Sequence, residues 1–454
     1  MKEVYKENFF LNYKYNIIAM LVYISLVLVF SPLLGANWVQ PGDFNIQTGG
    51  GLYHAVMIPA LLLAVIIASE LFYLPRWEKI FANALTYPTI ILTFIGNGII
   101  EGLNLPWGLA NDVIQGIRDV LLWVLAILFI IGLIVSAVKN KEFFKKTYGA
   151  FILLIVSSIS VAIAPIYAVV SLMPSFWSFP LFSSTISAVG NQTFVGNLIT
   201  SHSHQILPAA MCATAVIAAV AFSYYESSKR IKNLVNIGAI ISIIAIIAFT
   251  TIYWIAGVGT YSIPAIFTFG PSGVNGLALD DILTGLSGWG AVIMAVGVYL
   301  SLSKNDKNTR IFRTATIVIG FTIMAILILI GYSIEFNEAF YGFGSPGTPP
   351  TGGPGYMYDL AFMNAHLLTA FFLLPLLFLI FVAFDFMYKK DNNIKRYLSY
   401  LSFALMIISF YAVLYATMTA IETMLAIDVG LLISTVFIIM VITLVKRKEI
   451  LLTK

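Results

Sequence analysis

The chain has 454 residues, of which 60% are hydrophobic and only 10% are charged, and its formal net charge is +4. An ordinary soluble domain carries about 25% charged residues, so this composition excludes a soluble globular enzyme and predicts a polytopic membrane protein. The basic residues are scattered among short segments instead of forming a patch, which argues against nucleic acid as a partner.

Twelve apolar runs are long enough to span a membrane, for which about 20 mostly apolar residues are needed. In chain order they cover roughly 16–34, 53–73, 82–101, 117–138, 148–172, 204–225, 233–256, 281–303, 311–332, 360–387, 396–417 and 423–445. The weakest predictions are the third run, which contains Asn97, and the last two runs, whose connection is short. No small-residue cleavage site follows the first run, so it is expected to be a retained helix. The sequence thus predicts one all-α membrane domain over residues 1–454, a multi-pass protein of the plasma membrane in a lipid bilayer.

The basic residues predict the orientation of these helices. With twelve spans, seven basic segments fall on one side, and of the 25 lysines and arginines only Arg118 falls on the other. Because lysine and arginine concentrate in cytoplasmic loops, both termini are expected to be cytoplasmic. The segments on the outer side are long and rich in Gly, Pro, Ser and aromatic residues, which is typical of loops that cap a site or dock a partner.

The four histidines share one position in this topology. His54, His202, His204 and His366 lie at the outer ends of the second, sixth and tenth predicted helices. Those three segments resemble one another weakly, as a pseudo-repeat of four helices would. A histidine within a membrane is costly and normally faces the bundle interior or an aqueous cavity. Since imidazole is also a frequent axial ligand of haem iron, these histidines are candidate ligands.

The spacing of His202 and His204 limits what they can bind. Two residues on a helix are separated by about 200°, so the two side chains cannot ligate one haem from a regular helix. They could serve two haems b on opposite sides of the sixth helix, with His54 and His366 as the other axial ligands. One alternative is that the histidines are only hydrogen-bonded at the interface. Another is a loop at residues 201–203, which would let both bind a single ion such as copper, although no cysteine or carboxylate lies beside them.

The ionisable residues near the helix ends have simpler interpretations. Arg118 could bind a haem propionate or form a local ion pair with Asp112 or Asp119. Glu70, Glu226 and Asp385 are expected to be solvated at inner helix ends, and no acid is expected deep in the bilayer.

Twelve helices with outer-side histidines on the second, sixth and tenth resemble the catalytic subunit of the haem–copper oxidase and nitric oxide reductase superfamily. The resemblance implies that His54 and His366 ligate a low-spin haem, and the family's His-x-His pair is similar to His202-Ser203-His204. The chain departs from the family in lacking the adjacent His-His copper motif, since residues 233–256 contain no histidine. The resemblance is therefore to a member that keeps haems and has lost copper, similar to the haem b membrane subunits of archaeal respiratory chains.

These features predict a membrane b-type cytochrome. It would carry electrons near the outer face between a membrane quinol and an extracytoplasmic cytochrome, Rieske or blue-copper redox subunit. Two haems b are expected, with His54, His202, His204 and His366 as iron ligands and Arg118 as a propionate partner. One alternative is a divergent terminal oxidase or nitric oxide reductase. The other is a secondary transporter, although transporters usually have broken helices and charged residues at the membrane midplane.

Overall fold

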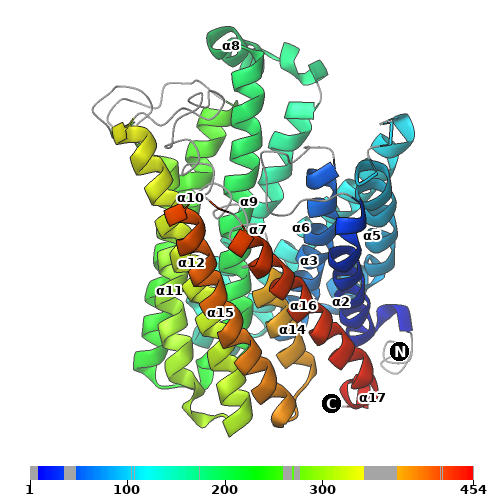
Figure 1. The fold of residues 1–454 in the computed structure, drawn as a ribbon, viewed down its shortest axis with the longest axis vertical. Coiled ribbons are helices and arrows are strands. Elements are labelled where there is room, and N and C mark those ends of the chain that lie inside the picture. Colours follow the sequence, from blue (N-terminus) through cyan, green and yellow to red (C-terminus); the bar gives the residue numbers. More distant parts are fainter. Residues whose placement is uncertain are drawn as a thin grey trace.

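The computed structural model describes residues 9–34, 48–103, 105–106, 108–172, 174–258, 268–269, 277–341, 376–419, 421 and 423–452. Most of these residues lie in helices (Figure 1). The first part of the chain forms η1 (Phe9–Leu11), α2 (Tyr13–Phe30), η2 (Ser31–Leu34), α3 (Thr48–Leu71), α4 (Arg76–Ala84), α5 (Thr86–Thr93), η4 (Phe94–Glu101), α6 (Leu109–Lys139), α7 (Lys141–Leu172), η5 (Pro174–Ser178), α8 (Pro180–Val189) and α9 (Asn191–Ala221). The second part forms η6 (Tyr224–Glu226), α10 (Lys229–Val258), β1 (Thr268–Phe269), β2 (Leu277–Ala278), α11 (Leu279–Ser301), η8 (Leu302–Lys304), α12 (Lys307–Tyr341), α14 (Phe378–Met387), α15 (Asn393–Thr419), α16 (Thr423–Val445) and α17 (Arg447–Leu452). The two short strands pair antiparallel.

Within the described ranges, nine helical stretches are long and apolar enough to cross a membrane, and Gln205–Ala221 and Phe378–Met387 are shorter apolar helices. On α6, Ile117, Val124 and Ile131 are 51%, 40% and 45% exposed. Their spacing of seven places them on one face of the helix, as expected of a surface that contacts lipid. The prediction of an all-α multi-pass membrane protein is thus supported. The described part of each predicted run is mostly helical, but the tenth run is described only from residue 376, so the count of twelve spans stays a prediction.

The third predicted span is not one uniform helix. It begins at Arg76 and consists of α4, α5 and η4, which are separated by Leu85 and by a change to a π-helix at Phe94. A π-helical turn inside a helix frequently marks a functional site. We refer to residues 76–101 as the third span.

The sixth predicted span also differs, because α9 begins at Asn191 and not near residue 204. A search for apolar runs misses this start, since the first turns of α9 carry Asn, Gln and Thr. Residues 201–204 therefore lie inside a long helix. The alternative of a loop at residues 201–203, which would let His202 and His204 bind one ion, is wrong.

The basic segments that the structure describes lie at one end of the bundle, where α2 begins and α17 lies (Figure 1). The Phe143 ring packs edge-on against Tyr73 at 5.1 Å and against Tyr225 at 5.3 Å, which brings together the turns after α3, α6 and α9. Lys390, after α14, pairs with Glu449 of α17 at 3.2 Å. Helix α8 lies at the opposite end (Figure 1). The shared end agrees with the predicted sidedness, and its cytoplasmic location stays a prediction.

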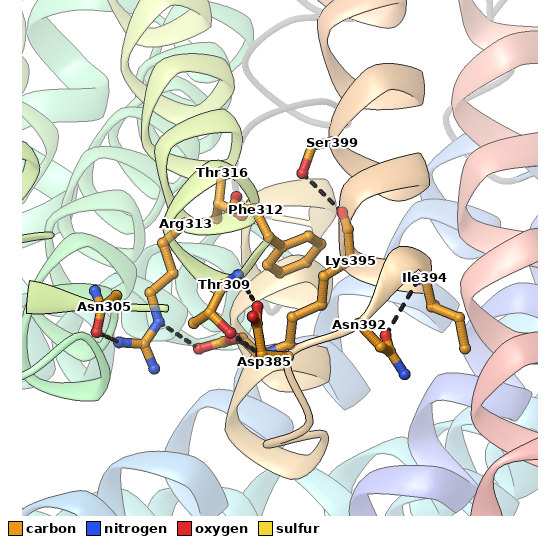
Figure 2. A network of polar contacts seen from close by, with 11 residues as sticks. Asn305, Thr309, Phe312, Arg313, Thr316, Asp385, Asn392, Ile394, Lys395 and Ser399 are labelled. Atoms are coloured by element: carbon orange, nitrogen blue, oxygen red, sulfur yellow. Dashed lines mark hydrogen bonds and ion pairs between the residues drawn. The ribbon is translucent and has the colours of Figure 1, made fainter. Parts of the chain in front are cut away.

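Asp385 is completely buried at the basic end, so the expectation that it is solvated is wrong. Its two oxygens bind different cations: Lys395 Nζ lies 2.7 Å from Oδ1 and Arg313 Nε lies 2.9 Å from Oδ2 (Figure 2). Lys395 also donates to Thr309 Oγ1 at 3.3 Å. These contacts join α12, α14 and α15. By contrast, Glu226 is exposed as expected.

The Asp385→Asn variant should lower the free energy of unfolding by about 3 to 5 kcal/mol, because it leaves two buried cations without their counter-charge. Thermal unfolding of the purified protein in detergent, followed by tryptophan fluorescence, measures the change. Glu142→Gln is the matched control, since Glu142 and Lys145 form an exposed pair and its loss should leave the unfolding midpoint unchanged. An Asp385→Asn protein as stable as the wild type would show that this carboxylate does not hold the three helices together.

Candidate functional site

Three helices that carry histidines in the sequence pack against one another. Helix α3, which contains His54, contacts α9, which contains His202 and His204, and α14 contacts both. Helix α14 is the described end of the predicted tenth span, and His366 lies outside the described residues. The side chain of His204 is also outside them. The structure therefore brings together the second, sixth and tenth predicted helices over the parts that it describes.

The His202 ring is fixed by helix α7. Its Nδ1 lies 2.9 Å from the carbonyl oxygen of Ala164. One turn further along the same face of α9, Gln205 Nε2 donates to the carbonyl oxygen of Ser160 at 3.1 Å. The Ser160 hydroxyl lies 2.9 Å from Thr250 Oγ1 of α10. Two side chains of α9 thus bind two successive turns of α7, which restricts the rotation of the imidazole.

This contact determines which ring nitrogen can bind a ligand. A carbonyl oxygen only accepts, so Nδ1 of His202 must carry the hydrogen, and in the neutral ring Nε2 carries the lone pair. Histidines that ligate metals usually donate their second nitrogen to a carbonyl or carboxylate in this way. His202 is only partly buried. Its Nε2 is therefore suited to bind an iron ion or to accept a hydrogen bond.

His54 lies close enough to His202 for the two imidazoles to interact electrostatically. Its ring packs edge-on against that of Tyr53, with the centroids 5.7 Å apart. Five residues further along α3, Pro59 has no N–H, and Pro208 has the same effect on α9 four residues after His204. His54 of α3 and His204 of α9 thus each lie about one helical turn before a proline that interrupts the backbone hydrogen bonding of the helix. The predicted ligands His54 and His202 come from different helices that pack against each other, and their role as haem ligands stays a prediction.

Arg118 is buried, 3% exposed, and belongs to a polar network that sequence reasoning found only in part. Its Nε donates to Asp119 Oδ1 at 2.8 Å, so the predicted local ion pair is present, and Nη1 donates to Asn97 Oδ1. Asn97 Nδ2 in turn donates to Glu101 Oε2 at 2.7 Å, and Gln115 Nε2 donates to Glu101 Oε1. The Glu101 carboxylate thus accepts an amide hydrogen bond at each oxygen.

The network lies directly beside the histidine-bearing helix α3. A Cβ placed on Gly51 would come within 2.7 Å of Glu101 Oε2, and His54 follows Gly51 by one helical turn. The Asn111 side chain is 2% exposed, and neither its nitrogen nor its oxygen has a partner among the described residues. Sequence reasoning missed Glu101 and Gln115. The only indication of this network in the sequence was Asn97, a polar residue within the third apolar run. It lies four residues before Glu101, which is one turn of a helix.

Among the described residues, no three His, Cys, Asp or Glu side chains are grouped to hold a metal ion. Comparison of the chain with known protein families, with curated proteins and with solved structures finds no match. The resemblance to the haem–copper oxidase superfamily therefore stays a prediction from the sequence.

Gly51→Ala should lower the free energy of unfolding by about 1 to 3 kcal/mol, because the added methyl group would overlap Glu101 and force α3 away from η4. Gly116→Ala is the control: it lies in α6 with open space around its Cβ, and alanine there should stabilise the protein by about 1 kcal/mol. Thermal unfolding in detergent compares the two variants. Equal stability of both would contradict the close packing of α3 on the third span.

Proposed function

We propose that this chain is a membrane b-type cytochrome that transfers electrons near the outer face, between a membrane quinol and an extracytoplasmic cytochrome, Rieske or blue-copper subunit. The observation that carries the proposal is the approach of His54 and His202 from neighbouring helices, with His202 Nδ1 bonded to the Ala164 carbonyl oxygen. This leaves Nε2 of His202 free to bind iron, with a second imidazole near enough on α3 to interact with it electrostatically.

The approach of His54 to His202 supports one of the two pairings left open by the sequence. His54 and His202 would hold one haem, and His366 and His204 would hold the second by ligand arithmetic. When bound, haem supplies a one-electron carrier that cycles between ferric and ferrous iron. The contribution of the protein is to fix the ligands: α7 orients the His202 ring through Ala164, and the Gln205–Ser160 contact holds α9 in register.

Arg118 would serve as the partner of a haem propionate. Its N–H groups are directed to Asn97 and Asp119, and a guanidinium carries further N–H groups. Because Asp119 already balances the Arg118 charge, a propionate would share this cation. Arg118 is buried beside the network that includes Glu101, so it would act from a fixed position.

A reduced-minus-oxidised visible spectrum of the purified protein, with a pyridine haemochrome assay, tests the proposal. We expect two low-spin haems b per chain. His54→Ala and His202→Ala should remove the same haem, and His204→Ala and His366→Ala should remove the other. A colourless protein, purified after expression with ample haem, would contradict the cytochrome proposal, and loss of different haems in His54→Ala and His202→Ala would contradict the pairing.

A secondary transporter is the second candidate, and one observation favours it. The third span is broken into α4, α5 and η4 and carries the buried carboxylates Glu78 and Glu101. Broken helices with buried polar groups are typical of transporters, whereas the sequence had suggested continuous helices. Solute uptake into proteoliposomes by a preparation without haem would favour this candidate over the cytochrome.

A further inference from the structure

A line of buried polar side chains follows the third span from the basic end of the bundle to the opposite end. We call it the third-span stripe. Its members and their exposed fractions are Glu78 (0%), Asn83 (1%), Thr86 (0%), Thr89 (3%), Thr93 (0%), Asn97 (2%) and Glu101 (7%). At 1.5 Å per residue the stripe extends over roughly 35 Å, slightly more than the hydrocarbon core of a bilayer.

The stripe faces the interior of the bundle. Its central members recur every three or four residues, which keeps them on one face of a helix. The opposite face is apolar and exposed: Ile91 is 55% exposed and Phe94 is 49% exposed. The third span therefore directs apolar side chains outward and polar ones toward α2, α3 and α6, against which it packs.

Two hydroxyl groups in the middle of the stripe have no partner in the part of the chain that the structure describes. Elsewhere in this bundle a buried helical hydroxyl usually donates to the carbonyl oxygen four residues earlier, as Ser25 does to Leu21 and Thr435 does to Leu431, both at 2.7 Å. Thr86 and Thr93 are equally buried, but no described residue bonds to either hydroxyl. A buried polar atom without a partner is costly, so such atoms usually bind water.

Further unpartnered atoms lie at intervals beside the stripe. They are Asn16 Oδ1 and Glu78 Oε2 toward the basic end, and the Tyr23 hydroxyl and both amide atoms of Asn111 toward the other end. Asn16 belongs to the stripe's surroundings because its Nδ2 donates to Asn83 Oδ1 at 2.7 Å. Tyr23 lies close enough to Arg118 for an electrostatic interaction. Unpartnered polar atoms thus occur along the whole length of the stripe.

The spacing of the stripe suits a chain of water molecules. From Asn83 to Glu101 the members are three or four residues apart and differ in height by about 4.5 to 6 Å, which is too long for a direct hydrogen bond but is spanned by one water with two bonds of about 2.8 Å. Glu78 lies five residues before Asn83, about 7.5 Å along the axis, a gap that needs about two waters. Hydroxyl groups and waters can each accept and donate, so a proton can pass along such a line. The stripe has a buried carboxylate at each end that can hold a proton.

The groups at the two ends select for a proton over a metal cation. At one end Glu78 Oε1 accepts from the Ser69 hydroxyl at 3.0 Å. At the other, both oxygens of Glu101 accept amide hydrogen bonds, and the positive Arg118 is joined to it through Asn97. At the Glu101 end the occupied carboxylate oxygens and the nearby guanidinium disfavour Na⁺ or K⁺, which need several free oxygen ligands. At the other end only Oε2 of the Glu78 carboxylate has no partner among the described residues, which is too few ligands for such a cation.

We propose that the third-span stripe is a proton path across the membrane, with Glu78 as its terminal carboxylate at the basic end and Glu101 at the opposite end. A proton enters at one carboxylate, is passed along the water and hydroxyl chain, and leaves from the other, with no bond made or broken other than to hydrogen. This path does not depend on haem, so it can hold or fail independently of the proposed cytochrome function.

Proton influx into vesicles tests the path. The purified full chain is reconstituted into phosphatidylcholine vesicles that contain pyranine and potassium, and valinomycin then sets an inside-negative potential. We expect acidification of the lumen faster than in vesicles without protein. Thr86→Val and Thr93→Val should each slow it roughly tenfold, because valine has the shape of threonine but leaves a gap that one water cannot bridge.

Matched variants separate conduction from folding. Thr435→Val makes the same change at a site that is also 0% exposed, but there the hydroxyl is bonded to Leu431, and the rate should not change. Thr86→Ser keeps a hydroxyl and should keep the rate. Replacing external sodium by choline should have no effect. Acidification no faster than in protein-free vesicles would overturn the proposal, as would wild-type rates in both valine variants or a rate that follows sodium.

Discussion

The packing of α3 between α9 and the third span is the contact on which the rest of the site depends. Near the start of α3, His54 interacts electrostatically with His202 of α9, and one turn earlier Gly51 lies against Glu101 of the third span. The close approach requires glycine, since the space that a Cβ would take is filled by the carboxylate. One helix therefore joins the histidines to the buried polar network, and a displacement of α3 would disturb both.

The membrane imposes a second constraint, which explains where the polar groups lie. In lipid, polar atoms must find partners within the protein or in enclosed water. This chain meets the requirement in two ways. At the basic end the negative charge of Asp385 is balanced by ion pairs with Lys395 and Arg313, so both carboxylate oxygens have partners within the protein. Along the third span the hydroxyls of Thr86 and Thr93 have no such partner among the described residues, which leaves a line of groups suited to water.

Helix irregularities occur close to these polar groups. Helices α3, α7 and α9 each contain a proline, and each proline removes one N–H from the helix and leaves a carbonyl group without its usual donor. The third span changes to a π-helix at Phe94, immediately before Asn97 and Glu101. Such irregularities are tolerated within a bundle because neighbouring helices and water satisfy the released groups. Here they lie next to the residues that carry the proposed electron and proton functions.

The sequence by itself determined the class of protein, the positions of most helices and the sidedness of the basic segments. Apolar runs and scattered lysines are local features, and burial of apolar surface with exclusion of charge from lipid acts on them directly. The sequence also identified the histidines and the helices that carry them. It missed the early start of α9, because polar residues can continue a helix beyond the apolar run, and the division of the third span.

Only the tertiary structure decided which polar residues act together. Asp385 resembles a solvated residue at a helix end until Arg313 and Lys395, both distant in sequence, surround it. Glu101 accepts hydrogen bonds from Gln115 of α6 and from Asn97, and its carboxylate fits against α3 because Gly51 has no side chain. The physical reason is that a hydrogen bond or ion pair between helices depends on their packing and on the direction of each side chain. Hydrophobic periodicity records which face is buried, but it does not record what that face meets.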